Sequence, residues 1–157
     1  MCWIVSALAH HISISFANAQ LYQMAITDGL TTLHTKRYFE KKIQDAIAGF
    51  HSSKRGFCML MLDLDHFKHF NDTFGHEVGD NLLRALGKFL GSSVRKEDVA
   101  CRYGGEEFVL ILPEAVAEIV RQRAEDIRRE FPNLQVVRRG QMLASVTLSL
   151  GVAMFPA

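Results

Sequence analysis

A tight turn between two apolar segments is the feature that most constrains how this chain of 157 residues can fold. The first segment covers residues 99–102, the second covers 108–112, and the turn between them contains Gly104 and Gly105. Two short apolar runs joined by a glycine-containing turn predict a β-hairpin. Because the strands of a hairpin are antiparallel, the chain cannot be a purely parallel, doubly wound fold.

The rest of the chain alternates between strand and helix patterns. The apolar run at 57–62 predicts a buried strand, and residues 146–152, where Thr and Ser alternate with apolar residues, predict another. Helical spacing of apolar residues predicts four helices, at 33–50, 66–74, 78–90 and 114–131. With 48% hydrophobic residues, the chain can bury one substantial core. We therefore predict an α/β (α+β) fold with a sheet that is at least partly antiparallel.

Charge and cysteine content narrow the function classes. The chain has 18 Lys and Arg against 17 Asp and Glu, a net charge of +1, which argues against a nucleic-acid or membrane partner for this segment. Any phosphate-binding site must then depend on a few nearby residues and not on the net charge of the chain. Cys2, Cys58 and Cys101 are odd in number and show no CxxC spacing, so we predict reduced cysteines in a cytoplasmic protein.

The first 26 residues predict a helix of their own. Apolar residues recur every three or four positions in a stripe that needs a partner, at Ile4, Leu8, Ile12, Phe16, Ala19 and Met24. The stripe is compatible with a coiled-coil seam, a dimer interface or the last helix of a preceding domain. Asp28 and Gly29 interrupt the helix, so we predict a domain boundary after residue 26 and a cap for the next helix at Thr31 or Thr32.

Acidic residues stand at two separate ends of the predicted strands. Asp63 and Asp65 follow the strand at 57–62, and Glu106 and Glu107 lie at the tip of the hairpin. Carboxylates beside an apolar sheet are costly unless a positive charge compensates them. Either pair alone is typical of ordinary turns, but together they indicate a cation site, and all-oxygen ligands suit Mg²⁺ or Mn²⁺ better than zinc.

Four blocks, in order, resemble the GGDEF diguanylate cyclase family. RYGGEEF at 102–108 is similar to its signature in the GGEEF form, and three further motifs match TDGLTTLHTKRYF at 27–39, DLDHFKHFNDTFGHEVGD at 63–80 and VTLSLGVA at 146–153. Two departures stand out. The family usually has Asn before its Arg pair where this chain has His34-Thr35-Lys36-Arg37, and its C-terminal helix and last strand, which also contact the triphosphate, have no counterpart here.

The resemblance implies a fold like the palm of nucleotidyl cyclases and polymerases, a central, mostly antiparallel sheet flanked by helices. It implies condensation of two GTP into cyclic di-GMP, with pyrophosphate released, by a dimer whose sites face each other. Two divalent ions per site, Mg²⁺ or Mn²⁺, are expected. In this interpretation, residues 1–26 form a signalling helix and 27–157 form the cyclase domain. Residues 9–30 resemble the last helix of a GAF-type sensor.

The family's functional positions carry over to this sequence as expectations. Metal would be bound by Asp63, the backbone carbonyl of Leu64, Glu106 and Glu107, and one of the two glutamates would act as the base. Lys68 and the backbone amides around Phe67 would contact the phosphates. The guanine readers would be Asn71 and Asp80, with His76 near the nucleotide. A carboxylate suits this task because it can accept from both guanine N1–H and the 2-amino group.

Arg95 and Asp98 form an R-x-x-D tetrapeptide where many family members bind their product as an inhibitor. An arginine can grip guanine or phosphate with two parallel hydrogen bonds. Two alternatives to the enzyme stay open at this point. One is a catalytically silent domain that binds GTP or cyclic di-GMP, and the other is a purely structural dimerisation domain, which would leave the clustered acids unexplained.

Overall fold

A five-stranded sheet forms the centre of the molecule in the computed structural model, which describes residues 2–133, 137–138, 141–142 and 146–156. The strand order is β1-β3-β4-β2-β7, with β1 His34–Thr35, β2 Phe57–Leu64, β3 Val99–Arg102, β4 Glu107–Pro113 and β7 Leu148–Phe155. Only the pairing of β1 with β3 is parallel among these strands. The predicted α/β fold, with a mostly antiparallel sheet and a β3–β4 hairpin, is confirmed.

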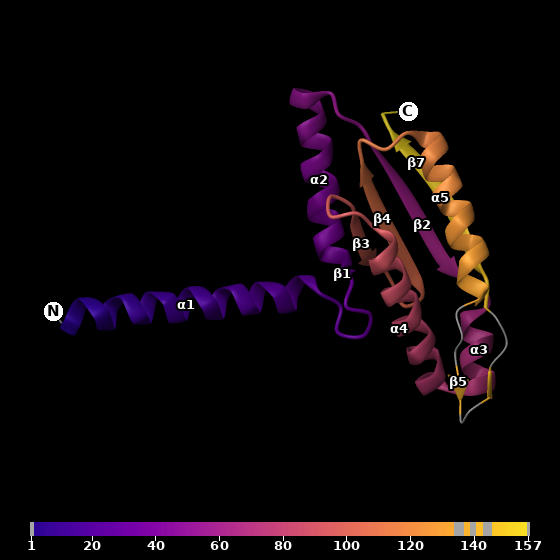
Figure 1. Cartoon of the computed structure of the whole chain (residues 1–157), viewed down its shortest axis with the longest axis horizontal. Helices are drawn as coiled ribbons and strands as arrows, with labels where there is room; N and C mark the ends of the chain where they lie inside the picture. The colour runs from indigo at the N-terminus through magenta and orange to yellow at the C-terminus, as the bar shows by residue number, and fades with distance from the viewer. Residues whose placement is uncertain (1, 134–136, 139–140, 143–145, 157) are drawn as a thin grey trace.

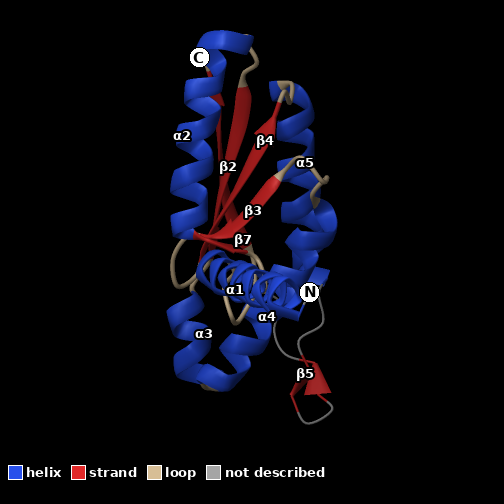
Figure 2. Ribbon diagram, turned by 90° about the vertical axis from the view of Figure 1, so that its left-hand side faces the viewer, coloured by secondary structure: helices blue, strands red, loops and turns tan. Residues whose placement is uncertain are grey.

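Helices cover both faces of the sheet. Their bounds are α1 Cys2–Ile26, α2 Lys36–Ser53, α3 Phe67–Phe74, α4 His76–Ser93 and α5 Ala117–Glu130, followed by the short 3₁₀ helix η1 Phe131–Asn133. Figure 2 shows the sheet between α2 on one side and α5 on the other. A small separate pair of strands is formed by β5 Val137–Arg138 and β6 Gln141–Met142, and β5 is at the lower end of the molecule in Figure 2.

Strand β2 divides the core into two clusters because its side chains alternate between the faces of the sheet. Leu60, Leu62 and Leu64 are fully buried in the larger cluster, together with apolar residues of α4 and α5. On the opposite face, Phe57 of β2 packs with Phe39 of α2 and with Val109 and Ile111 of β4 in a smaller cluster. The sheet is thus a fixed platform, and its strand ends can hold polar side chains in defined places.

Two predicted helix starts were too early. Helix α2 begins at Lys36 because His34 and Thr35 are used by β1. Neither Thr31 nor Thr32 caps it, since the Thr31 hydroxyl donates to Asp28 Oδ1 at 2.7 Å and the Thr32 hydroxyl donates to the Thr31 carbonyl at 2.6 Å. Helix α5 begins at Ala117, after Glu114 has adopted a positive φ of 55° that no right-handed helix allows. The long-range pairing of β1 is the feature that local periodicity could not reveal.

Helix α1 projects away from the sheet as a single exposed rod (Figure 1). Its side chains at Trp3, Ile12, Phe16 and Met24 are between 65% and 76% exposed. The predicted helix is confirmed, and Ile4 and Leu8 of the predicted stripe have side chains outside the described residues. None of the helices that the structure describes is long and apolar enough to cross a membrane.

Cys58 and Cys101 are buried and free, as predicted from their spacing. Burial raises the pKa of the Cys101 thiol to about 12. A thiol with so high a pKa is protonated at neutral pH and is a poor nucleophile or metal ligand. The Cys101 thiol is therefore not a candidate nucleophile, and the side chain of Cys2 lies outside the described residues.

Candidate active site

The predicted acidic residues meet where β2 ends and β4 begins. Asp63 and Glu107 are direct partners in the antiparallel register, and the Leu64 N–H donates to the Glu106 carbonyl at 3.4 Å. Like charges placed opposite each other on neighbouring strands are destabilising. The sheet therefore holds the predicted metal ligands together at an electrostatic cost.

The two glycines at the tip of the hairpin have different surroundings. Tyr103 N–H and Gly104 N–H both donate to the Glu107 carbonyl, at 2.8 and 3.1 Å. A side chain at Gly104 would collide with the Glu107 carboxylate, whereas one at Gly105 would meet no described atom within 4 Å. The two glycines are thus unequal, because only Gly104 makes room for a predicted site residue.

The surroundings of Glu106 change the pKa of its carboxyl group. Burial, followed by repulsion from Asp63 and Glu107, raises the pKa of the Glu106 carboxyl above its ordinary value. A divalent cation would relieve this repulsion, so the donors fit the predicted ions in charge and in chemistry. In the described part of the chain, no three His, Cys, Asp or Glu side chains stand close enough to form a ready-made cage. A cation held here would need further oxygen ligands besides these carboxylates.

A pocket of about 550 Å³ opens beside this cluster, between α3, α4 and the hairpin turn. It brings together six of the predicted residues, namely Phe67, Lys68, Asn71, His76, Asp80 and Glu106. The lining of this pocket does not include Asp63 and Leu64 of β2 or Glu107 of β4. Sequence reasoning missed three lining residues, Asp72, Leu83 and Arg102. The position of Arg102 next to the acidic turn was the available signal.

Asn71 contributes a buried hydrogen-bond acceptor to this pocket. Its Oδ1 is buried and has no hydrogen-bond partner among the described residues. A side chain at Gly79 would overlap this oxygen, so α4 can approach Asn71 only with glycine there. An unpaired buried acceptor is costly, and a ligand N–H in the pocket would remove that cost.

Asp65, although only two residues from Asp63, is engaged elsewhere. Its carboxylate accepts from Thr147 Oγ1 at 2.5 Å and from Ser149 Oγ at 2.6 Å. The hydrogen bonds from Ser149 and Thr147 lower the pKa of Asp65. Asp65 therefore joins the end of β2 to β7, and its grouping with Asp63 in the sequence does not extend to the structure.

The lowered pKa of Asp65 predicts a pH-dependent contribution to stability. A carboxyl whose pKa is lower in the folded state stabilises the fold above its ordinary pKa, and this stabilisation is lost as the pH falls through the folded pKa. We expect Ser149→Ala to reduce the free energy of unfolding by about 0.5–1 kcal/mol at pH 7 and by less near pH 3, in urea titrations. Ser92→Ala, which removes a hydroxyl bonded to a backbone carbonyl, should show no such pH dependence. An equal loss at both pH values for Ser149→Ala would contradict the assignment.

Arg95 and Asp98 lie in one tight turn, but their side chains have different surroundings. Asp98 accepts from its own turn, through Arg95 N–H at 2.8 Å, and from Arg123 Nη1 at 2.9 Å. Its side chain is only 5% exposed, whereas Arg95 is exposed. Arg123 of α5, which sequence reasoning missed, also donates to the Ser93 carbonyl. Asp98 thus fixes the turn, while the Arg95 side chain stays exposed.

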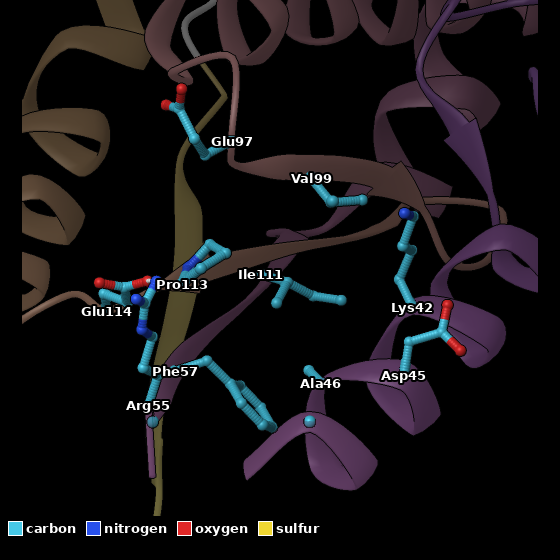
Figure 3. A pocket seen from close by; sticks show the side chains of 12 residues that line it. Lys42, Asp45, Ala46, Arg55, Phe57, Glu97, Val99, Ile111, Pro113 and Glu114 are labelled. Carbon is cyan, nitrogen blue, oxygen red and sulfur yellow. Dashed lines mark hydrogen bonds and ion pairs between the residues drawn. The ribbon is translucent and has the colours of Figure 1, made fainter. Parts of the chain in front are cut away.

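A second hollow, of about 340 Å³, lies on the α2 face of the sheet (Figure 3). Phe57, Val99 and Ile111 contribute apolar side chains to its lining. Figure 3 shows Arg55 reaching Glu114, with 2.9 Å between Nη1 and Oε1, while Glu97 points away from both. None of the described residues lining this hollow belongs to the predicted site, so the nucleotide is better sought in the pocket beside the acidic cluster.

Comparisons with known proteins give this geometry its context. Diguanylate cyclase A of Treponema denticola is 36% identical over 155 residues, which cover 97% of this chain and 42% of that protein. Diguanylate cyclase VdcA of Vibrio cholerae is 41% identical over 136 residues, covering 85% of this chain and 39% of the relative. The chain therefore spans about two fifths of the length of these relatives.

Solved structures agree with the sequence relatives. The coiled coil and GGDEF domain of DgcB from Caulobacter crescentus, in complex with c-di-GMP, superposes with a TM-score of 0.89 at 32% identity, covering 96% of this chain and 80% of that one. The family model described as "Diguanylate cyclase, GGDEF domain" matches residues 25–157, which include the whole sheet and the acidic turn. The chain belongs to the GGDEF diguanylate cyclase family.

Proposed function

We propose that this protein is a diguanylate cyclase that condenses two GTP into cyclic di-GMP. The observation that carries the proposal is the shared pocket, which joins Lys68 and Asp80 to the acidic turn at Glu106. In each of two steps, the 3′-oxygen of one GTP bonds to the α-phosphorus of the other. The bond from that phosphorus to the β-phosphate oxygen breaks, and pyrophosphate leaves. One of Glu106 and Glu107 accepts the proton of the 3′-hydroxyl.

The donor set supports two divalent ions per site, Mg²⁺ or Mn²⁺. Asp63, the Leu64 carbonyl, Glu106 and Glu107 would hold them. When bound, such ions stabilise charge on the attacking and leaving oxygens. The raised pKa of Glu106, caused by burial and then by Asp63 and Glu107, is the property expected of carboxylates gathered for a cation.

Phosphate binding is proposed for the start of α3. The helix begins at Phe67 after His66, and no described side chain caps it, so its first backbone amides are available to an anion. Lys68, exposed in the first turn of this helix, adds a positive charge in the same pocket. Together these groups would bind the triphosphate and offset charge developing on the leaving pyrophosphate.

Guanine is proposed to bind deeper, between α3 and α4. Asn71 Oδ1 has no hydrogen-bond donor among the described residues, and an N–H group of guanine could donate to it. Asp80 lines the same pocket and can accept from N1–H and the 2-amino group together, a donor pair that adenine lacks. We place His76, also in the lining, beside the nucleotide.

A homodimer is proposed because the reaction needs two GTP molecules facing each other. A pocket of about 550 Å³ is of the size that holds one ligand. Helix α1 contains no Asp, Glu, Lys or Arg, and its apolar side chains are exposed, so a second copy could cover them. Pairing through α1 or through a sensor domain ahead of it would bring the two sites together. The GAF-type origin of α1 and the cytoplasmic location stay predictions.

Arg95→Ala tests the proposed product site. We expect the variant to need about tenfold more cyclic di-GMP for half-inhibition while its initial rate is unchanged, because a bidentate grip on the ligand is lost. The turn itself should persist, since Arg95 holds it through its backbone N–H. Product titrations of the initial rate would measure the shift. Lys96→Ala, the neighbouring exposed cation, is the control, and overlapping curves for Arg95→Ala and wild type would reduce R-x-x-D to an ordinary loop.

The function itself is tested by incubating the full-length protein with GTP and Mg²⁺ and identifying the product by mass. Formation of cyclic di-GMP with two pyrophosphates per product molecule is expected. Binding of GTP or cyclic di-GMP without turnover would instead identify a silent binding domain and overturn the proposed activity.

A further inference from the structure

Arg102 connects the acidic turn to the segment that follows α1. It is the last residue of β3, and its guanidinium donates to the Gly105 carbonyl through Nη2 at 2.7 Å and through Nε at 3.2 Å. The remaining nitrogen, Nη1, lies 3.3 and 3.4 Å from the two carboxylate oxygens of Asp28. One side chain thus bridges two segments that are 74 residues apart in the chain.

Asp28 is itself held in a fixed position. Its Oδ1 accepts from Thr31 N–H at 2.9 Å and from the Thr31 hydroxyl at 2.7 Å. Thr31 is only 2% exposed and packs so closely on α4 that any side chain at Gly87 would overlap its backbone. Burial acts to raise the pKa of Asp28, but hydrogen bonds from Thr31 and the charge of Arg102 outweigh it and lower the pKa. Asp28 is therefore an ionised, anchored partner at neutral pH.

The turn gathers acidic side chains that repel one another, so a contact that restrains it from outside would oppose that repulsion. A side chain at Gly105 would meet no described atom within 4 Å, so the turn faces open space on that side. Glu106, the next residue, is followed by Glu107, which lies opposite Asp63 in the register of β2 and β4, so three carboxylates gather at this turn. The hydrogen bonds from Arg102 to the Gly105 carbonyl act on the residue directly before this predicted ligand.

We propose that Asp28 and Arg102 are positioning residues that hold the Gly104-Gly105 turn in its metal-binding shape. Asp28 lies two residues beyond the end of α1, so the pair also connects that helix to the turn. This inference rests on the proposed function for its kinetic consequences. Its structural part, the restraint of the turn, can be measured without any turnover.

Asp28→Asn is the sharpest variant. Asparagine keeps an oxygen for Thr31 and nearly the same shape, but it removes the charge that orients Arg102. Asp28 is not in the pocket lining, whereas Arg102 is, so an effect of Asp28→Asn cannot come from a lost contact with substrate. Arg102→Lys keeps a cation but loses the planar fork that reaches two partners at once. Glu114→Gln, which breaks the exposed ion pair with Arg55 far from the turn, is the matched control.

Hydrogen exchange and kinetics on the full-length protein test the proposal. For Asp28→Asn we expect amide exchange at Tyr103 and Gly104 to accelerate about tenfold, with β4 unchanged. We expect kcat to fall about tenfold, KM for GTP to change less than about twofold, and half-saturation to require more Mg²⁺. Direct Mn²⁺ binding, measured by electron paramagnetic resonance without nucleotide, should weaken in parallel. Arg102→Lys should show the same pattern, and Glu114→Gln should match wild type.

Three results would overturn the inference: unchanged exchange at the turn in Asp28→Asn, faster exchange with unchanged kcat and Mn²⁺ binding, or a uniform loss of protection across the sheet together with a lower melting temperature. The last would reveal a merely structural role. If the wild-type protein makes no product, the proposed function fails, and exchange with Mn²⁺ binding still decides whether the pair positions the turn.

Discussion

Glu106→Gln and Glu107→Gln are each expected to remove nearly all cyclic di-GMP synthesis while the domain stays folded. Glutamine keeps the size of the side chain but cannot act as a base and contributes no charge to a metal ion. Loss of a general base or of such electrostatic stabilisation typically lowers kcat by about 10²–10⁴-fold. Initial rates with GTP and Mg²⁺, read by product mass, would measure the loss. Turnover at the wild-type rate in either variant would remove that glutamate from the catalytic assignment.

The same substitution at Glu106 should have the opposite effect on stability without metal. Because the pKa of Glu106 is raised in the folded state, its ionisation destabilises the fold as the pH rises from the ordinary pKa through the raised one. Glu106→Gln should therefore melt at a higher temperature than wild type at pH 7 in chelator. Below the ordinary pKa, where Glu106 is protonated in both states, this advantage should disappear. Glu130→Gln, an exposed position at the end of α5, provides the control for a simple change in net charge.

The parts of the fold that the sequence could predict are those set by neighbouring residues. The β3–β4 hairpin follows from two apolar runs and the glycines between them. The position of Glu107 opposite Asp63 comes instead from the pairing of β4 with β2, which is distant in the chain. The start of α2 could not be predicted in the same way. His34 and Thr35 leave the helical pattern to pair with β3, a partner 67 residues away, and that pairing has no local signal.

At the candidate site, too, contacts between distant parts of the chain limit what the sequence can predict. Asp63 and Asp65 look equivalent in the sequence, but Asp65 is bound by Thr147 and Ser149, which lie more than 80 residues away. Asp98 reads as a ligand-facing acid of an R-x-x-D motif, yet Arg123 from α5 encloses it. In both cases a distant partner, and not the motif, decides what the carboxylate does. Motifs therefore indicate a candidate site, and packing determines which of their side chains remain free to contact a ligand.

Asp80→Asn is expected to weaken the preference for GTP over ATP. The carboxylate of Asp80 can accept from both N–H donors of guanine, whereas asparagine presents one acceptor and one donor to the same edge. With adenine, Asp80 would be left facing a ligand edge that lacks this donor pair, and such unpaired polar groups cost about 1–3 kcal/mol. The ratio of kcat/KM for GTP and ATP should fall by about tenfold to a hundredfold in the variant. Asp80→Ser, which has a hydroxyl and no carboxylate, should also lose selectivity.

Asp72→Asn separates a contact with guanine from a general effect of charge. Asp72 lines the same pocket but lies exposed on α3, and its substitution removes the same unit of charge. A long-range charge effect would act on GTP and ATP alike, since both carry the same triphosphate. We therefore expect Asp72→Asn to change KM for both nucleotides by a similar factor and to leave their ratio unaltered. If Asp72→Asn relaxed selectivity as much as Asp80→Asn, or if Asp80→Asn left the ratio of GTP to ATP unchanged, guanine would be read by other residues of the pocket.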